Sequence, residues 1–270
     1  MLLDVLEVSK KLMSFRSISG EKDQGSIEYL DNILTDLGFS CQQITFEGDG
    51  SYPVLNLYAE KGSGDRNLCF AGHTDVVPPG DEESWSVPPF EPQIVDGYLI
   101  GRGAVDMKAS IAAWVVAVAE YLQSGEFKDK AGKLSFLITG DEEADSVNGT
   151  EKLLKWYENN GKKINSCVVG EPTNPTKVGE MMKVGRRGSI NFELTVKGVQ
   201  GHVAYPDQAD NPVSKLVKIL DKLDSHEFDK GNEFFPPTNL EVTSIDVGNK
   251  TTNLIPEQAV AKFNIRFNDI

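Results

Sequence analysis

The first two thirds of the chain alternate between two spacings of hydrophobic residues. Some stretches repeat apolar residues every three to four positions, which is typical of amphipathic helices, and others are short apolar runs typical of buried strands. Because strands that alternate with helices build parallel sheets, we predict an α/β domain with a mostly parallel sheet flanked by helices. The predicted helices span residues 1–15, 21–37, 107–123 and 150–159, and the predicted strands span residues 40–46, 54–59, 67–71, 98–100, 133–139 and 166–169.

The pattern changes after about residue 177. Residues 189–197, 240–247 and 259–267 alternate apolar and polar side chains, as half-exposed antiparallel strands do, and residues 211–223 have the spacing of an amphipathic helix. We therefore predict two domains, one over residues 1–180 and a smaller α+β domain over residues 181–270. The chain stops directly after a strand, so we expect the second domain to be incomplete.

Charge and composition narrow the class of protein. The 41 acidic and 27 basic residues give a formal net charge of −14, which argues against nucleic-acid binding because that function needs a basic surface. The longest apolar run, residues 111–119, is far shorter than the roughly 20 residues of a membrane-spanning helix. Three widely spaced cysteines and the lack of a secretory signal fit a reducing compartment. We expect a soluble cytoplasmic protein that binds no membrane.

Polar residues follow four of the predicted strands. His73 and Asp75 follow the first, Asp106 the second, the run Asp141–Glu143 the third and Glu171 the fourth. Ligands of an open α/β sheet bind beyond the carboxyl ends of its strands, so these side chains can converge in one crevice. Histidine nitrogen and carboxylate oxygen are ligands that Zn²⁺ accepts. The sequence therefore predicts a metal site.

Different positions in this set suit different tasks. A metal-binding imidazole needs a partner for its second ring nitrogen, and Asp75, two residues after His73, is a candidate. Glu142 and Glu143 are adjacent on a loop, so one can bind metal while the other acts as a general base. Asp106 precedes an apolar helix and has a second interpretation as a helix cap.

Other catalytic motifs are excluded by the sequence. Residues 101–106 begin like a dinucleotide-binding fingerprint, but Asp106 replaces the last glycine and would repel a pyrophosphate. The chain has no GxSxG nucleophile motif and no GxxxxGK[ST] phosphate-binding loop.

Several of these segments resemble the dinuclear-zinc aminoacylase and carboxypeptidase G2 type of metallohydrolase. They are Gly72–Gly80, Gly101–Lys108, Thr139–Glu143 and Gly170–Thr173. The resemblance covers essentially the whole chain. It implies a zinc-peptidase-like catalytic domain with an inserted α+β domain for dimerisation or lid closure, both incomplete at the C-terminus, and a homodimer formed through the second domain.

The resemblance also implies the ligands of two Zn²⁺ ions, for which Co²⁺ is a possible substitute. His73 and Glu171 bind one ion, Glu143 binds the other, and Asp106 bridges both.

Catalytic roles follow from the same resemblance. Glu142 is the general base, and Asp75 orients the metal-binding histidine. His202 corresponds to a histidine that crosses the dimer interface to stabilise the oxyanion, and Asn253 assists from the same side.

Two segments of the second domain, Val184–Ser189 and Gly198–Pro206, narrow the resemblance to the desuccinylases of this family. These enzymes hydrolyse N-succinyl-L,L-2,6-diaminopimelate to succinate and L,L-2,6-diaminopimelate in lysine and diaminopimelate biosynthesis. Arginine suits bidentate recognition of the substrate carboxylates. The candidate substrate-binding residues are Arg186, Ser189, Tyr205 and Arg266.

The chain also departs from the family. Members usually continue well beyond the position of Ile270, with a glycine-rich substrate loop and a second metal-binding histidine. The second ion keeps only Asp106 and Glu143, so we expect it to bind weakly in this fragment. Two alternatives stay open. The chain could act on acetylornithine or another N-acyl amino acid, or it could be a catalytically inactive fragment that binds metal and dimerises.

Overall fold

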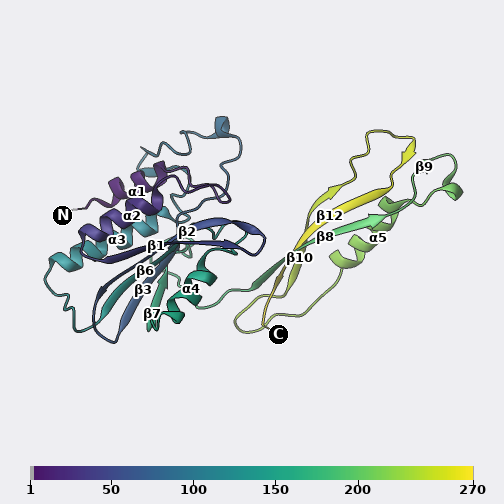
Figure 1. Ribbon diagram of the computed structural model, residues 1–270. Helices are drawn as coiled ribbons and strands as arrows, with labels where there is room; N and C mark the ends of the chain where they lie inside the picture. The colour runs from purple at the N-terminus through teal and green to yellow at the C-terminus, as the bar shows by residue number, and fades with distance from the viewer. Residues whose placement is uncertain (1–2, 270) are drawn as a thin grey trace. The chain divides into compact units, whose positions relative to one another are not determined.

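The computed structural model describes residues 3–269, and the chain divides into two compact units (Figure 1). Unit 1 is Met1–Thr173 and unit 2 is Asn174–Ile270. The structure divides the chain after Thr173, whereas the hydrophobic pattern predicts a division after residue 180. Residues 174–187 form neither helix nor strand, so a change of periodicity could not locate the division more closely.

A five-stranded sheet forms the centre of unit 1. Its strands are β1 (Ser40–Gly48), β2 (Ser51–Gly62), β3 (Asn67–His73), β6 (Lys133–Thr139) and β7 (Ser166–Val169). They lie in the order β1-β2-β6-β3-β7, so that β1 and β7 are the two edges. β3 pairs in parallel with β6 and β7, but β2 pairs antiparallel with β1 and β6. The sheet is therefore mixed, and the expectation of a mostly parallel sheet is wrong for the half that contains β1 and β2.

The antiparallel half contains a hairpin that the sequence encodes locally. Asp49 and Gly50 connect β1 to β2, and their φ angles are both positive, at 54° and 79°. A two-residue turn can join only antiparallel strands, and an Asp-Gly pair is a strong hairpin signal. This part of the topology could have been predicted from the sequence.

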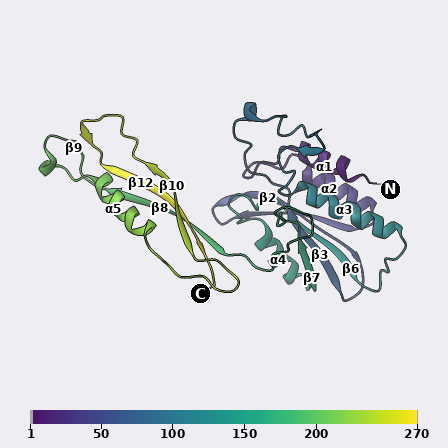
Figure 2. The ribbon, with the colours of Figure 1, turned by 180° about the vertical axis from the view of Figure 1, so that it is seen from behind.

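Helices cover both faces of the sheet, as Figures 1 and 2 show. They are α1 (Val5–Ser14), α2 (Ser26–Asp36), α3 (Lys108–Gln123) and α4 (Thr150–Asn159). α1, α2 and α3 lie on one face, where Leu30, Ile111 and Phe136 share one hydrophobic core. α4 lies on the other face, where the rings of Tyr157 and Tyr58 have centroids 5.5 Å apart. Apolar layers on both faces hold the strands, and so their ends, in place.

The carboxyl ends of β3, β6 and β7 meet at one edge of the sheet because these strands are parallel. His73 at the end of β3 pairs with Thr139 at the end of β6. Ala71 of β3 pairs with Val169 at the end of β7. The loops that follow these three strands therefore begin side by side. The connection from β3 to α3 also carries η1 (Glu82–Ser84), β4 (Gln93–Val95) and β5 (Tyr98–Ile100).

Unit 2 is a three-stranded antiparallel sheet with a helix on one face. Its elements are β8 (Gly188–Lys197), β9 (Gly201–His202), η2 (Pro206–Gln208), α5 (Pro212–Asp224), β10 (Asn239–Asp246), β11 (Leu254–Ile255) and β12 (Gln258–Phe267). The strand order is β10-β12-β8, and β9 pairs separately with β11. Leu216 and Leu220 of α5 share a core with Ala259 and Ala261 of β12. Within residues 3–269, no helix has both the length and the apolar character needed to cross a membrane.

Candidate metal centre and substrate-binding residues

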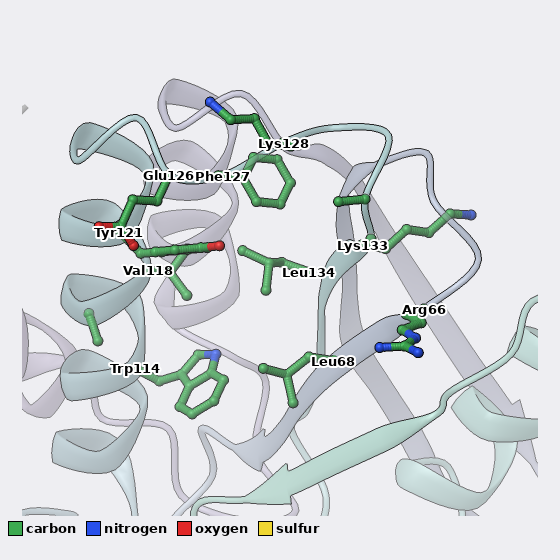
Figure 3. Close-up of a pocket in the computed structure, with 13 residues that line it drawn as sticks. Arg66, Leu68, Trp114, Val118, Tyr121, Glu126, Phe127, Lys128, Lys133 and Leu134 are labelled. Carbon is green, nitrogen blue, oxygen red and sulfur yellow. The ribbon is translucent and has the colours of Figure 1, made fainter.

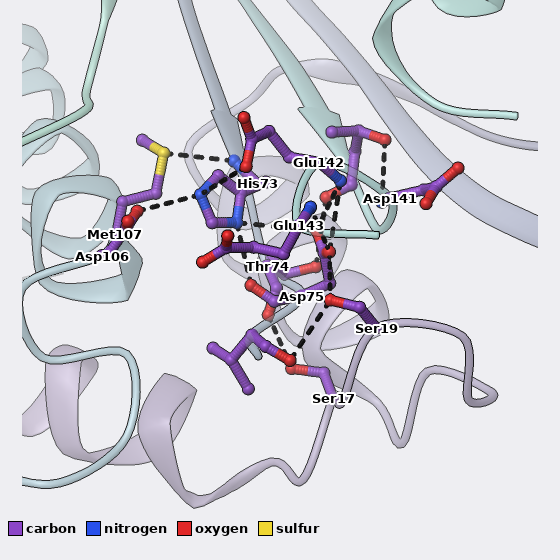
Figure 4. A network of polar contacts seen from close by, with 12 residues as sticks. Ser17, Ser19, His73, Thr74, Asp75, Asp106, Met107, Asp141, Glu142 and Glu143 are labelled. Carbon is purple, nitrogen blue, oxygen red and sulfur yellow. Dashed lines mark hydrogen bonds and ion pairs between the residues drawn. The ribbon is translucent and has the colours of Figure 1, made fainter. Parts of the chain in front are cut away.

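His73 is buried at the edge where β3, β6 and β7 end (Figure 4). Its Nδ1 lies 2.8 Å from the backbone carbonyl oxygen of Asp75. A carbonyl oxygen only accepts hydrogen bonds, so Nδ1 carries the proton and Nε2 is the atom that faces the acidic side chains. Nε2 is 3.1 Å from Asp106, 3.4 Å from Glu171 and 3.9 Å from Glu142.

Two overlapping groups of side chains in this cluster could each hold a metal ion. The ligand atoms of His73, Asp106 and Glu143 lie within 4.8 Å of one another, and so do those of His73, Glu142 and Glu171. The structure thus brings together every residue that the sequence analysis placed at the metal. One imidazole among carboxylates is a donor set that fits Zn²⁺ and other divalent ions.

Asp75 supports this cluster with both its backbone and its side chain. Its carboxylate accepts the backbone N–H groups of Glu142 at 3.1 Å and Glu143 at 3.0 Å, and the hydroxyl of Ser19 at 2.6 Å. The carboxylate is 3.5 Å from Nδ1 of His73, farther than the backbone carbonyl. The expected orientation of His73 therefore comes mainly from the carbonyl of Asp75, while the carboxylate anchors the loop of the two glutamates.

The negative charges of the cluster are not balanced by its surroundings. Burial by itself lowers the pKa of His73, but hydrogen bonds to Asp75 and Glu171 outweigh it and raise the pKa to about 11. Burial raises the pKa of Glu142 and of Glu143, and nearby carboxylates raise both further. All three shifts favour uptake of positive charge, which a divalent cation would supply.

Met107 fixes the loop that carries Asp106 against the sheet. Its side chain is fully buried, and its sulfur accepts the backbone N–H of His73 at 3.4 Å. A Cβ atom on Gly72 would lie 2.5 Å from the Met107 methyl carbon, and one on Gly170 would lie 2.6 Å from it. The two glycines therefore leave the space that lets Met107 place Asp106 beside His73.

Three of the residues predicted to act from the second domain lie at one end of unit 2. β9 pairs His202 with Leu254, which directly follows Asn253, and the His202 and Tyr205 rings have centroids 5.9 Å apart. The backbone N–H of Ala204 donates to Nδ1 of His202 at 3.1 Å. The neutral ring therefore carries its proton on Nε2, which leaves an exposed donor.

The other predicted substrate-binding residues lie at the opposite end of unit 2. Ser189 and Arg266 are paired across β8 and β12, and Arg186 precedes Ser189 by three positions. β8 separates them from His202 and Tyr205 by roughly 25 Å, at about 3.3 Å per residue. Within one unit 2, the structure does not bring the four predicted substrate-binding residues to one place.

A separate apolar cavity of about 470 Å³ opens in unit 1 between α3 and the strands β3 and β6 (Figure 3). Trp114, Tyr121, Phe127 and Leu134 are among the residues that line it. Its lining shares no residue with the two candidate ligand groups found among residues 3–269. The metal cluster, not this cavity, is therefore the candidate site of chemistry.

Comparison with known families identifies the chain's relatives. A family model described as "Peptidase family M20/M25/M40" matches residues 69–258, a range that contains every residue of the metal cluster. The chain belongs to the M20 peptidase family. The His73 cluster is therefore part of a chain from a peptidase family, and peptidases hydrolyse peptide bonds.

Curated relatives match this M20 chain over its whole length. The chain is 51% identical over 271 residues to a succinyl-diaminopimelate desuccinylase of Ehrlichia canis, in a match that covers 100% of this chain and 70% of the relative. It is 51% identical over 264 residues to a succinyl-diaminopimelate desuccinylase of Pelagibacter ubique, covering 98% of this chain and 68% of the relative. The chain thus spans about 70% of the length of such relatives.

Solved M20 structures share the fold. An M20 family metallo-carboxypeptidase from Sulfolobus solfataricus matches with a TM-score of 0.79 at 22% identity, covering 98% of this chain and 71% of that chain. A dinuclear metal binding peptidase of the M20 family from Bacillus subtilis matches with a TM-score of 0.59 at 17% identity, covering 98% of this chain and 64% of that chain. At these identities the comparison establishes the fold of the chain.

Two residues that support this M20 site, Ser19 and Asp141, have no role that the sequence pattern predicts. The hydroxyl of Ser19 reaches Asp75 from 56 positions away, and no local pattern marks it. Asp141 belongs to the acidic run before Glu142, but its carboxylate accepts hydrogen bonds from the loop that follows. The only sequence signal for Asp141 was its place in that run, which does not distinguish a supporting acid from a catalytic one.

Proposed function

We propose that this chain hydrolyses N-succinyl-L,L-2,6-diaminopimelate to succinate and L,L-2,6-diaminopimelate, with divalent metal bound at the His73 cluster. The observation that carries the proposal is the convergence of His73 with four carboxylates at one edge of the sheet. The 51% identity to a desuccinylase over the whole chain supports the substrate. The reaction belongs to lysine and diaminopimelate biosynthesis, which supports a cytoplasmic location as part of the proposal.

The acidic side chains and His73 would hold two divalent ions, Zn²⁺ or Co²⁺. His73 and Glu171 would bind one ion, Glu143 the other, and Asp106 both. Bound ions polarise the amide carbonyl and lower the pKa of the attacking water. Within residues 3–269 the second ion has fewer protein ligands than the first, so we expect it to bind more weakly.

Glu142 would move the proton during hydrolysis. Its carboxylate faces the cluster, 3.9 Å from Nε2 of His73, and remains partly exposed to solvent. Burial raises its pKa, which brings a carboxylate closer to the range where a general base works best. As the new C–O bond forms, Glu142 takes a proton from the attacking water. As the C–N bond breaks, it returns that proton to the leaving amine.

A symmetric homodimer would account for the two separated groups in unit 2. Arg186, Ser189 and Arg266 would bind the substrate carboxylates in one chain. The tip that carries His202 would enter the site of the partner chain, where its Nε2–H donates to the oxyanion. Removing such a donor typically costs about 3–4 kcal/mol of transition-state stabilisation. Tyr205 and Asn253 would act from the same tip, because they lie beside His202.

Hydrolysis of the succinyl substrate by the purified, Zn²⁺-loaded chain tests the proposal. We expect succinate release that falls by about 10²–10⁴-fold in Glu142→Gln, the range for loss of a general base, with metal content unchanged. His73→Ala should lose metal as well as turnover, as measured by elemental analysis.

A second substrate and the metal content distinguish the alternatives. Hydrolysis of N-acetylornithine but not of the succinyl substrate would replace the proposal by a deacetylase activity. Bound metal without turnover of either substrate would show that the chain is a metal-binding protein without this catalysis.

A further inference from the structure

We propose that Asp141 is a positioning residue that sets the directions of Glu142 and Glu143. The inference rests on the proposed function, in which these two glutamates act as base and metal ligand. Asp141 follows β6 and is only 1% exposed. Figure 4 shows its carboxylate turned away from His73. It belongs to neither group of candidate metal ligands found among residues 3–269.

The carboxylate of Asp141 closes the loop that follows it. It accepts the backbone N–H groups of Ser146 at 3.1 Å, Val147 at 3.0 Å and Asn148 at 3.2 Å. The hydroxyl of Tyr52 on β2 also donates to it. Hydrogen bonds to a charged acceptor are stronger than those to a neutral one. One buried carboxylate therefore fixes the second half of the loop, residues 146–148, and connects it to strand β2.

The two glutamates are held from the other side by Asp75. Its carboxylate accepts the N–H groups of Glu142 and Glu143 at 3.1 and 3.0 Å. The hydroxyl of Ser146 donates to the carbonyl oxygen of Glu142 at 2.7 Å, which links the two ends of the loop. Asp75 thus holds the first half of the loop at Glu142 and Glu143, and Asp141 holds its second half at residues 146–148. With the backbone fixed at both ends, the glutamates keep the directions that place their carboxylates around His73.

Substitution of Asp141 removes the acceptor of several donors at once. Asp141→Asn keeps one accepting oxygen and replaces the other with an NH2 group, which only donates. The donors on the replaced oxygen, either Ser146 N–H and the Tyr52 hydroxyl or the N–H groups of Val147 and Asn148, then lose their partner, the negative charge is lost, and the loop can leave its position. A merely structural role would lower stability and leave the folded site unchanged. A positioning role changes the folded site itself. Asp145 offers a matched control because it is an exposed acid of the same loop, whose carboxylate accepts a hydrogen bond from Ser51 at 2.8 Å.

The test compares Asp141→Asn and Asp145→Asn with the parent chain, all well below their melting temperatures. Co²⁺ binding is measured by calorimetry and absorption, and hydrogen exchange is measured over residues 140–149. Loss of a partner behind a metal site typically costs 10–100-fold in metal affinity or activity. We expect Asp141→Asn to weaken Co²⁺ binding by about 10-fold or more and to speed exchange of the Glu142 and Glu143 amides. On the succinyl substrate, the kcat of Asp141→Asn should fall by a similar factor, with KM nearly unchanged. The control Asp145→Asn should match the parent chain in Co²⁺ binding, amide exchange and kcat.

Parent-like Co²⁺ affinity and amide exchange in folded Asp141→Asn would overturn the proposal, whatever happens to its melting temperature. Equal losses in Asp141→Asn and Asp145→Asn would overturn it too. If Asp141→Asn does not fold, Tyr52→Phe removes a single donor and should change both measurements in the same direction, while parent-like values would count against the proposal. A parent chain that binds Co²⁺ without hydrolysing the substrate would remove the proposed function, and the binding and exchange measurements would still decide the role of Asp141.

Discussion

The carboxylates around His73 differ in how many hydrogen bonds they accept. Asp75 is buried, and burial by itself raises its pKa, but hydrogen bonds from His73 and Ser19 outweigh burial and lower it. Glu142 and Glu143 have raised pKa values, because burial and neighbouring acids act on them without comparable compensation. Hydrogen bonds to the ionised form of Asp75 stabilise its negative charge, so it can hold the surrounding loop in place. The raised pKa values of Glu142 and Glu143 favour uptake of positive charge at these two side chains, either as a proton or as a metal ion.

Loss of the Ser19 hydroxyl should weaken metal binding through Asp75. This hydroxyl donates to the carboxylate at 2.6 Å, and a hydrogen bond to a charged group is worth about 1.5–3 kcal/mol. We expect Ser19→Ala to lower the free energy of unfolding by about that amount and Zn²⁺ affinity by roughly 10-fold. Urea unfolding and calorimetry measure the two effects. Ser17→Ala is the control, because Ser17 donates to the backbone carbonyl of Thr74 instead. It should lose stability and keep its Zn²⁺ affinity.

The metal-free protein should become less stable as the pH rises above about 6.5. The pKa of His73 is raised to about 11, from about 6.5 in an unfolded chain. Its contribution to stability is therefore complete below pH 6.5 and is lost as the pH rises toward 11, by up to about 1.4 kcal/mol per pH unit for one proton. The raised pKa values of Glu142 and Glu143 also make the protein less stable as the pH rises, and their effect begins at a lower pH than that of His73. Urea unfolding with a chelator at pH 6 and pH 9 measures the slope, which should shrink in His73→Ala. A stability that rises over this interval would contradict the expectation.

At the scale of elements, local patterns determined much of the fold. α3 spans Lys108–Gln123 where residues 107–123 were predicted, and α4 matches its predicted range of Thr150–Asn159. Helix periodicity depends on neighbours in sequence, so it can be read from one chain. Strand order depends on pairings between distant segments, which is why the antiparallel pairing of β2 with β6 was not foreseen. Most of the metal cluster was predictable because His73, the Glu142–Glu143 pair and Glu171 come at or after strand ends that share an edge. Asp106 instead follows β5, which belongs to a separate two-stranded sheet, so the strand pattern alone did not place it. Support from Ser19 was not predictable, since it depends on tertiary packing.

The hairpin turn between β1 and β2 should depend on the backbone freedom of Gly50. Its φ is 79°, and no atom lies within 4 Å of the position that a Cβ atom would take. Any cost of Gly50→Ala therefore comes from the left-handed backbone alone, about 1–2 kcal/mol of unfolding free energy. Thermal unfolding of metal-free protein measures it. Gly50→Asn should cost less, because asparagine tolerates this conformation better. Equal costs for the two variants would show that the turn is not under this constraint.

At the scale of the whole molecule, the proposed tasks are divided between the two units. The candidate metal ligands all lie in Met1–Thr173, and the candidate residues for substrate carboxylates and the oxyanion lie in Asn174–Ile270. Solved M20 structures at 22% and 17% identity share this fold.

Mixing two inactive variants tests whether His202 serves the partner's site. Glu142→Gln lacks the proposed base, and His202→Ala lacks the proposed oxyanion donor. In a mixed dimer, one of the two sites then has both groups intact. Random exchange makes half of the dimers mixed, so we expect the mixture to recover about a quarter of parent activity. Activity assays after subunit exchange measure it, with each variant alone as the control. A mixture no more active than its components would show that His202 acts within its own chain or not at all.

The open edge of β7 affects how this chain behaves when concentrated. β7 ends the order of the five-stranded sheet, and it has no further strand beside it among residues 3–269. Val168 and Val169 are 43% and 58% exposed, and Ser166–Val169 contains neither a proline nor a charged residue. Proteins usually protect such edges with those residues, because unpaired backbone groups are a template for strands of other molecules. β7 can therefore pair with a strand of another molecule, and only its short length of four residues restricts this route to aggregation, which is independent of the metal chemistry.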